Sequence, residues 1–122
     1  MSLEPILPMS GHRPRAARLA LDSRCDGDGT VVIAACGEID MGTAPRLRDA
    51  LTAALAGDSV RRVLLDMSGV TFLDSSGIAA LIDAHHAAAR GDRTVRLSNT
   101  CPFVTRVLEI TGLAETLGLG AA

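Results

Sequence analysis

The chain has 122 residues, of which 48% are hydrophobic, so its length and composition suit one domain with a core of its own. Its formal net charge is −2, all 12 basic residues are Arg, and it contains two Phe but no Trp or Tyr. Nucleic-acid-binding domains normally carry a basic surplus, and those that bind single strands add aromatic stacking side chains, so direct nucleic-acid binding is not expected. No segment approaches the roughly 20 apolar residues that a membrane-spanning helix requires.

The N-terminal stretch differs from the rest of the chain. Residues 1–15 contain three prolines and no regular apolar pattern, so we expect a flexible N-terminal arm there and one folded domain over residues 16–119. Its short apolar run is interrupted by Glu4 and has no basic residues before it, which argues against a signal peptide. The arginines at positions 13, 15 and 18 are interpreted as parts of a solvated tail.

Three cysteines, Cys25, Cys36 and Cys101, are widely separated and form no C-x-x-C pair. Their odd number and spacing predict neither a disulfide framework nor a zinc site. We therefore expect a reducing, cytoplasmic location.

The first half of the domain predicts two strands and a helix. The segment "ARLALDSR", the turn "DGDG" and the apolar run "TVVIAACGEI" (30–39) indicate a strand, a tight turn and a second strand. A helix is expected over 42–58, because Thr43 can cap it, Pro45 falls in its first turn, leucines recur every four residues and Gly57 ends it.

The second half predicts a continued alternation of strands and helices. We expect a buried strand over 60–68, a turn at 68–72, a helix over 75–90, a strand over 93–99, a helix over 100–112 and a last short strand over 113–119. Strands that alternate with helices in this way favour an α/β fold. The expected architecture is a mixed, mostly parallel sheet of four to five strands with helices packed on it.

The stretch "FLDSSGIA" places a carboxylate and two hydroxyls where a helix begins, and several interpretations are open. Asp74 or a serine can simply cap the helix, which contributes about 1 kcal/mol. A nucleophilic serine needs a base within hydrogen-bond reach, but His85 and His86 lie ten and eleven residues further on, roughly 15 Å along the helix. The two neighbouring histidines point about 100° apart, so they do not form a metal site. We expect no catalytic residue, no metal and no cofactor.

The same turn could instead be a phosphorylation switch. A phosphoryl group on Ser75 would meet the positive end of the helix dipole, and it would add about −1.5 to −2 charges beside Asp74. If the sheet brings the loop after the second strand alongside, Glu38 and Asp40 would also be near. Weakening a complex by about 100-fold to 1,000-fold corresponds to roughly 3–4 kcal/mol. Repulsion and desolvation at a contact surface can supply that, whereas the helix dipole, at about 0.3–1 kcal/mol, cannot.

An ordered set of motifs from about residue 17 to residue 119 resembles the STAS domain of bacterial anti-sigma-factor antagonists. The matching segments are "GEID" at 37–40 with "MGTAPRLRDAL" after it, "LLDMSGVTFLDSSGIAAL" at 64–81, "VRLSN" at 95–99 and "VLEITGL" at 107–113. The resemblance implies that Ser75 is the phosphorylated residue. It also implies a partner-binding surface formed by Glu38, Asp40, Thr43, Asp74, Ser76 and Gly77.

This resemblance further implies a binding module that is not an enzyme. The unphosphorylated domain would bind an anti-sigma factor, itself a serine kinase of the histidine-kinase-like ATPase fold, and release a sigma factor, while a serine phosphatase would reset it. The alternative is a ligand-sensing or transporter-associated STAS module that binds a nucleotide or another small molecule.

The C-terminus departs from the family pattern. Family members usually end with a further helix, whereas this chain ends in "LGLGAA", so we expect that helix to be short or missing. An apolar surface would then be left bare, and a homodimer could cover it.

Overall fold

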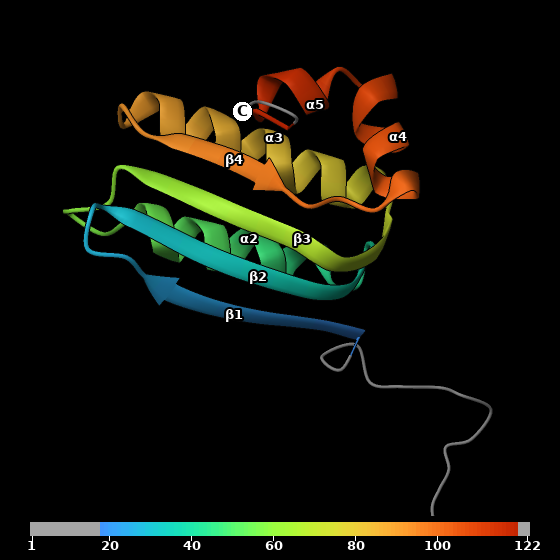
Figure 1. Ribbon diagram of the computed structural model, residues 1–122, viewed down its shortest axis with the longest axis horizontal. Coiled ribbons are helices and arrows are strands. Elements are labelled where there is room, and N and C mark those ends of the chain that lie inside the picture. Colours follow the sequence, from blue (N-terminus) through green and yellow to red (C-terminus); the bar gives the residue numbers. More distant parts are fainter. Residues whose placement is uncertain (1–17, 120–122) are drawn as a thin grey trace, which may run out of the picture.

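A four-stranded sheet forms the centre of the computed structural model, which describes residues 18–119. The strands β1 (Leu19–Cys25), β2 (Thr30–Ile39), β3 (Arg62–Leu73) and β4 (Thr94–Ser98) lie in that order across the sheet (Figure 1). β1 pairs with β2 in the antiparallel sense, and β2, β3 and β4 are parallel. The expected mixed, mostly parallel sheet is confirmed. The predicted arm over residues 1–15 lies outside the described residues.

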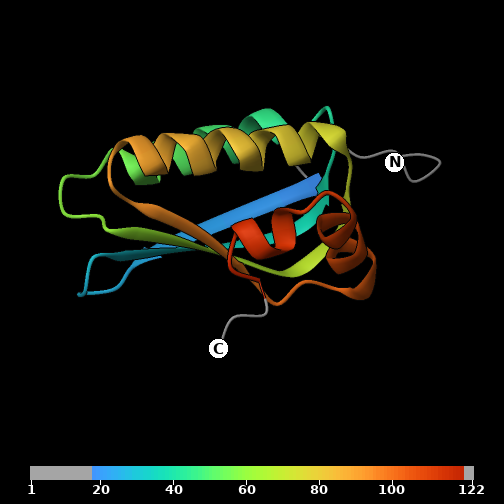
Figure 2. The same cartoon turned by 90° about the horizontal axis from the view of Figure 1, so that it is seen from above.

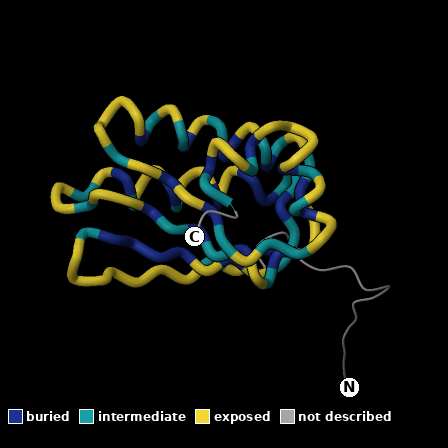
Figure 3. The backbone as a smooth tube through the Cα atoms, turned by 45° about the horizontal axis from the view of Figure 1, so that its top comes forward, coloured by how far each residue is buried: buried dark blue, intermediate teal, exposed yellow. Residues whose placement is uncertain are grey.

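Helices cover both faces of this sheet. α2 (Ala44–Leu55) and α3 (Ser75–Arg90) lie side by side on one face, and α4 (Pro102–Ile110) with the short α5 (Leu113–Thr116) lies on the other (Figure 2). The predicted leucine stripe of α2 is buried, as are the inward positions of the strands, whereas the connecting turns are mostly exposed or half-buried (Figure 3). The core is aliphatic; its largest fully buried side chains include Ile33, Leu47, Leu65, Met67, Leu81 and Leu108.

The turn expected at residues 68–72 is wrong, because β3 continues through this segment to Leu73. The pairing of β2 with β3 shifts register between Ala34 and Cys36 and again between Gly37 and Glu38. At the first shift, a Cβ on Gly69 would lie 2.9 Å from the Cys36 side chain. Gly69 therefore permits close approach of two bulged strands, and it does not form a turn.

The last strand expected over residues 113–119 is also wrong, because α5 occupies the first part of this segment. Gly112 ends α4 with a left-handed backbone (φ 79°), and Leu113 and Leu117, four residues apart, are both buried. The Leu97 N–H of β4 donates to the Leu117 carbonyl at 3.0 Å. One hydrogen bond at the edge of β4 thus takes the place of the expected strand.

Candidate functional site

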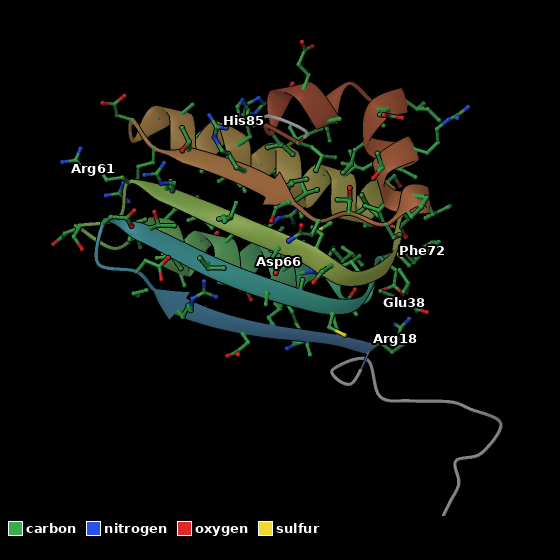
Figure 4. All side chains as sticks on the ribbon, in the orientation of Figure 1. Arg18, Glu38, Arg61, Asp66, Phe72 and His85 are labelled. Carbon is green, nitrogen blue, oxygen red and sulfur yellow. The ribbon has the colours of Figure 1, made fainter. Side chains whose placement is uncertain are left out.

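The parallel pairing of β2 and β3 brings two loops to the same edge of the sheet. Ile39 at the end of β2 is the register partner of Leu73 at the end of β3, and the Asp74 N–H donates to the Ile39 carbonyl at 3.2 Å. The loop after β2 and the start of α3 are therefore neighbours. This is the arrangement that the sequence left open, and it places Glu38 and Asp40 near the Asp74–Ser75 turn. Figure 4 shows Arg18, Glu38 and Phe72 at this end of the molecule.

Asp74 caps α3. Its backbone is extended, and its carboxylate accepts hydrogen bonds from the Ser76 N–H at 2.9 Å and the Gly77 N–H at 3.3 Å. These are two of the donors that the first turn of a helix leaves unpaired. The interpretation of this turn as a helix cap is thus correct for Asp74, and it leaves the serine hydroxyls without a capping role.

Ser75 is the first residue of α3, and it is exposed. Within residues 18–119 its hydroxyl makes no hydrogen bond, because Asp74 performs the capping. Ser76 is half-buried beside it. An exposed hydroxyl at a helix N-terminus, with backbone N–H groups close by, is accessible to an enzyme and suits a group that will carry negative charge.

Gly77 is buried and has a packing role at the same turn. A Cβ at this position would lie 2.3 Å from Leu73 Cδ1 and 2.7 Å from Ile39 Cγ2. The lack of a side chain therefore lets α3 begin directly over the ends of β2 and β3. Gly77 therefore contributes to the packing beneath the site, and it presents no side chain to the surface.

Thr43 is fully buried in the loop after β2. Its hydroxyl donates to the Glu38 carbonyl at 2.7 Å and accepts from the Asp40 N–H at 2.9 Å. Although Thr43 occupies the N-cap position of α2, its side chain makes no capping bond, so the capping role expected for it is wrong. The Thr43 hydroxyl thus stabilises the conformation of the loop through these two hydrogen bonds, and Thr43 can influence a partner only through the shape of that loop.

Arg18 is not part of a solvated tail. Its guanidinium lies 2.5 Å from Asp40 Oδ2 and 3.7 Å from Glu38 Oε1, and the Arg18 side chain is 25% exposed. The contrary expectation failed because the acids that Arg18 contacts are about twenty residues away in sequence. Arg13 and Arg15 lie outside the described residues.

The Asp40 carboxyl is held in its charged form. Partial burial acts to raise its pKa, but the hydrogen bond from Arg18 and those from the Gly42 and Thr43 N–H groups outweigh this and hold the pKa below its usual 3.8. The loop therefore presents Asp40 as a neutralised ion pair, while Glu38 remains half-exposed beside it.

An aromatic pair that the sequence patterns did not indicate lies at this edge. Phe72, the register partner of Glu38, stacks on Phe103 of α4 with ring centroids 5.9 Å apart and ring planes 14° from parallel. Phe72 is 39% exposed, Phe103 is 50% exposed, and Met41 in the loop after β2 is 75% exposed. The available signal was compositional, since these are the only two aromatic residues of the chain.

Other kinds of site can be assessed in the part of the chain that the structure describes. Residues 18–119 contain no group of three or more His, Cys, Asp or Glu side chains placed to hold a metal ion, and none of their helices is long and apolar enough to span a membrane. The three cysteines are free thiols. A groove of about 390 Å³ between β1 and α2 is mainly apolar, with Leu21, Ile33 and Ala54 among its lining residues, and Ser75 is not part of it.

Comparison with known proteins agrees with this architecture. The STAS domain family matches residues 26–121. The anti-sigma F factor antagonist of Lysinibacillus sphaericus is 31% identical over 85 residues, which cover 69% of this chain and 72% of that protein. The crystal structure of an anti-sigma factor antagonist from Mycobacterium paratuberculosis superposes with a TM-score of 0.75 at 31% identity and covers 90% of each chain.

Two more distant likenesses concern the fold alone. The phosphorylated form of the Bacillus cell fate determinant SpoIIAA has a TM-score of 0.64 at 23% identity, covering 79% of this chain and 86% of that one. The same fold also occurs in transporter proteins. The family match and the relatives at 31% identity establish that this chain belongs to the STAS domain family, among the anti-sigma factor antagonists.

Proposed function

We propose that this protein is a phosphorylation-switched binding module without catalysis of its own, acting in the cytoplasm. With Ser75 unmodified it binds an anti-sigma factor that is a serine kinase, and the sigma factor held by that kinase is released. Transcription is thereby activated without contact between this protein and nucleic acid. A serine phosphatase returns the modified protein to its binding form.

The observation that carries the proposal is the state of the Ser75 hydroxyl. It is exposed at the N-terminus of a 16-residue helix, and its neighbour Asp74 already satisfies the first-turn N–H groups of Ser76 and Gly77. Modification of Ser75 therefore breaks no hydrogen bond among residues 18–119. The positive end of the helix dipole favours the added charge by about 0.3–1 kcal/mol, which offsets repulsion from Asp74.

The chemistry of the switch is a phosphoryl transfer followed by hydrolysis. Ser75 Oγ attacks the γ-phosphorus of ATP bound to the kinase, the bond to the bridging oxygen breaks, the hydroxyl proton passes to a base of the kinase and ADP leaves. In the reset step, water attacks the phosphorus of phosphoserine, the bond to Ser75 Oγ breaks, and serine and inorganic phosphate result. The nucleotide belongs to the kinase alone, and any metal ion in either step belongs to the partner enzymes.

The partner-binding surface is proposed to surround Ser75. Glu38, Asp74 and Ser76 are exposed or half-buried at this edge and can touch a partner directly. Asp40 is held by Arg18, and Thr43 and Gly77 are buried, so these residues act through the conformation of the loop and of the helix start. A phosphoryl group enters the middle of this arrangement. The resulting dianion would be enclosed with Asp74 and Glu38 when a partner covers the edge, and this enclosure weakens the complex.

Two of the comparisons support this proposal. A relative at 31% identity is an antagonist of an anti-sigma factor, and a protein of the same fold exists in a phosphorylated form. The alternative of a transporter-associated or ligand-sensing module draws on the occurrence of the fold in transporters. The groove between β1 and α2 is mainly apolar, and its lining is unlike a nucleotide phosphate site, which would present backbone N–H groups and basic side chains.

The direct test is intact-mass spectrometry. The purified chain is incubated with ATP and, one at a time, with the ATPases of histidine-kinase-like fold encoded in its own genome. We expect one of these kinases to add a single phosphoryl group. Ser75→Ala should gain none, whereas Ser68→Ala, a control at an exposed hydroxyl of β3 outside the proposed partner-binding surface, should still be modified. Undiminished modification of Ser75→Ala, or no modification of the wild-type chain by any kinase, would contradict the proposal.

A further inference from the structure

The only two aromatic residues of this chain lie on its surface and stack on each other. The core is built entirely from aliphatic side chains and Met67, so neither ring is needed to fill it. Exposing apolar area to water is unfavourable, and aromatic side chains are enriched at the central contacts of protein interfaces. A stacked aromatic pair that is 39% and 50% exposed is therefore a candidate contact surface.

Both rings are held in place before any partner arrives. Phe72 is fixed by the pairing of β3 with β2, two residues before the Asp74 cap. Phe103 lies in the first turn of α4, which is anchored by the buried Val104 and Leu108. The connection from β4 to α4 is tied by a hydrogen bond from Asn99 Nδ2 to Asp66 Oδ1 at 3.2 Å and by one between the Thr100 and Thr105 hydroxyls. Such preorganisation reduces the entropic cost of binding.

We propose that the Phe72–Phe103 pair is the apolar anchor of the partner-binding surface, and that the anti-sigma factor covers the two rings with an uncharged, apolar recess. The inference rests on the proposed function, since the pair is continuous with the Ser75 edge through Phe72, three residues earlier in the chain. The aromatic pair supplies affinity, and Ser75 supplies control over it.

The recess must be uncharged for the switch to work in the proposed direction. A lysine or arginine of the partner placed beside Ser75 would form charge-assisted hydrogen bonds to a phosphoryl group and would tighten the complex. An apolar recess instead removes water from around the rings, and a dianion at the rim of such a water-excluded contact loses its hydration without compensation. The same desolvation that makes the pair a strong anchor thus makes phosphorylation disruptive.

The pair offers a direct spectroscopic probe, because a chain labelled with 4-fluorophenylalanine contains only two fluorine atoms. In the free protein we expect both ¹⁹F signals to show the solvent-isotope shift of rings exposed to water. Addition of the kinase identified by intact mass, with ADP, should shift both signals and reduce their solvent-isotope effect. Phosphorylation of Ser75 should restore the spectrum of the free form. Phe103→Leu assigns the two signals.

Affinity measurements complete the test. Phe103→Ser should weaken binding of the kinase by about 30-fold, the size of an interface hot spot. Ile110→Ser, at the other end of α4 and 72% exposed, removes a similar apolar side chain away from Ser75 and should change affinity by less than about 2-fold. Denaturant unfolding of both variants checks that they remain folded.

Two groups of outcomes separate the inference from the proposed function. If no kinase binds or modifies the wild-type chain, the proposed function fails. If the wild-type chain binds and is switched, but Phe103→Ser binds equally well or the ¹⁹F signals do not move, only the aromatic anchor is overturned. Rings already shielded from solvent in the free protein would also overturn it. Shielding that depends on protein concentration would indicate that a second copy covers the rings. Shielding that does not depend on concentration would indicate that residues 1–17 cover them.

Discussion

Two helices begin at the same edge of the sheet, each after a parallel strand and each close to a hydroxyl side chain, yet the two hydroxyls are in opposite situations. Thr43 at the start of α2 is fully buried and makes hydrogen bonds to Glu38 and Asp40. Ser75 at the start of α3 is exposed, and its hydroxyl makes no hydrogen bond among residues 18–119. The difference shows that a carboxylate cap at Asp74 releases the next hydroxyl for another use.

The comparison separates structure from function within one small region. At the α2 start the hydroxyl belongs to the folded state, and altering it should affect stability. At the α3 start the hydroxyl is available for modification, and altering it should affect partner binding.

The largest effect is expected for charge at position 75. Ser75→Asp should weaken binding of the kinase, because a buried like charge in an interface can cost several kcal/mol, and stoichiometric phosphorylation should weaken it by about 100-fold to 1,000-fold. Ser75→Ala should bind as tightly as the wild-type chain. Isothermal titration in the presence of ADP measures all three. An affinity of the phosphorylated form equal to that of the unmodified form would contradict the assignment of Ser75.

Thr43→Val should lower the free energy of unfolding by about 1–3 kcal/mol, because it removes a hydroxyl that pairs with buried backbone groups. Ser75→Ala is the matched control, and it should change stability by less than about 0.5 kcal/mol. Urea unfolding followed by circular dichroism measures both variants. Equal losses at the two positions would show that the contrast between the hydroxyls is wrong.

Asp74→Ala should destabilise the protein by about 1 kcal/mol, since it removes the side chain that caps α3. Asp74→Asn keeps a capping oxygen and should recover most of this loss. The same urea titrations apply, and a stability of Asp74→Ala equal to wild type would mean that another residue, Ser75 included, provides the cap.

The smallest effect concerns the ion pair between Arg18 and Asp40. Because the folded-state pKa of Asp40 lies below its usual 3.8, its stabilisation is fully present above that value and is lost as the pH falls through the folded-state pKa. Asp40→Asn should therefore be less stable than wild type by about 0.2–1 kcal/mol at neutral pH, and the difference should disappear in acid. Unfolding measured from neutral pH down to about pH 2 tests this, and a difference that persists at the acid end would argue against the ion pair.

Much of this arrangement could be predicted from the sequence, because it depends on local signals. The leucine spacing of α2, the position of Pro102 at the start of α4 and the Asp-Ser-Ser-Gly helix start all gave elements that the structure contains. The α/β class followed from the alternation of strands and helices. The adjacency of Glu38 and the Asp74 turn depended on strand order, which the sequence alone left open.

The features that escaped prediction are those that depend on contacts distant in sequence. Gly69 is typical of a turn in the sequence, but in the structure it lies opposite Cys36 of β2 and permits close approach of the two strands. Leu117 follows the short helix α5, and its carbonyl accepts one hydrogen bond from the Leu97 N–H of β4. Arg18 was assigned to a tail because Asp40 is far along the chain. The stacking of Phe72 on Phe103 required the β4–α4 connection to fold back over the end of β3.

The homodimer suggested by the sequence remains a prediction.

A phosphoryl group on Ser75 should be tolerated by the free protein and not by its complex. One preparation of phosphorylated protein, confirmed by intact mass, should be divided between urea unfolding and titration with the kinase in ADP. We expect a free energy of unfolding within about 1 kcal/mol of that of the unmodified protein, together with an affinity for the kinase at least about 100-fold weaker. A large loss of stability with unchanged affinity would contradict it.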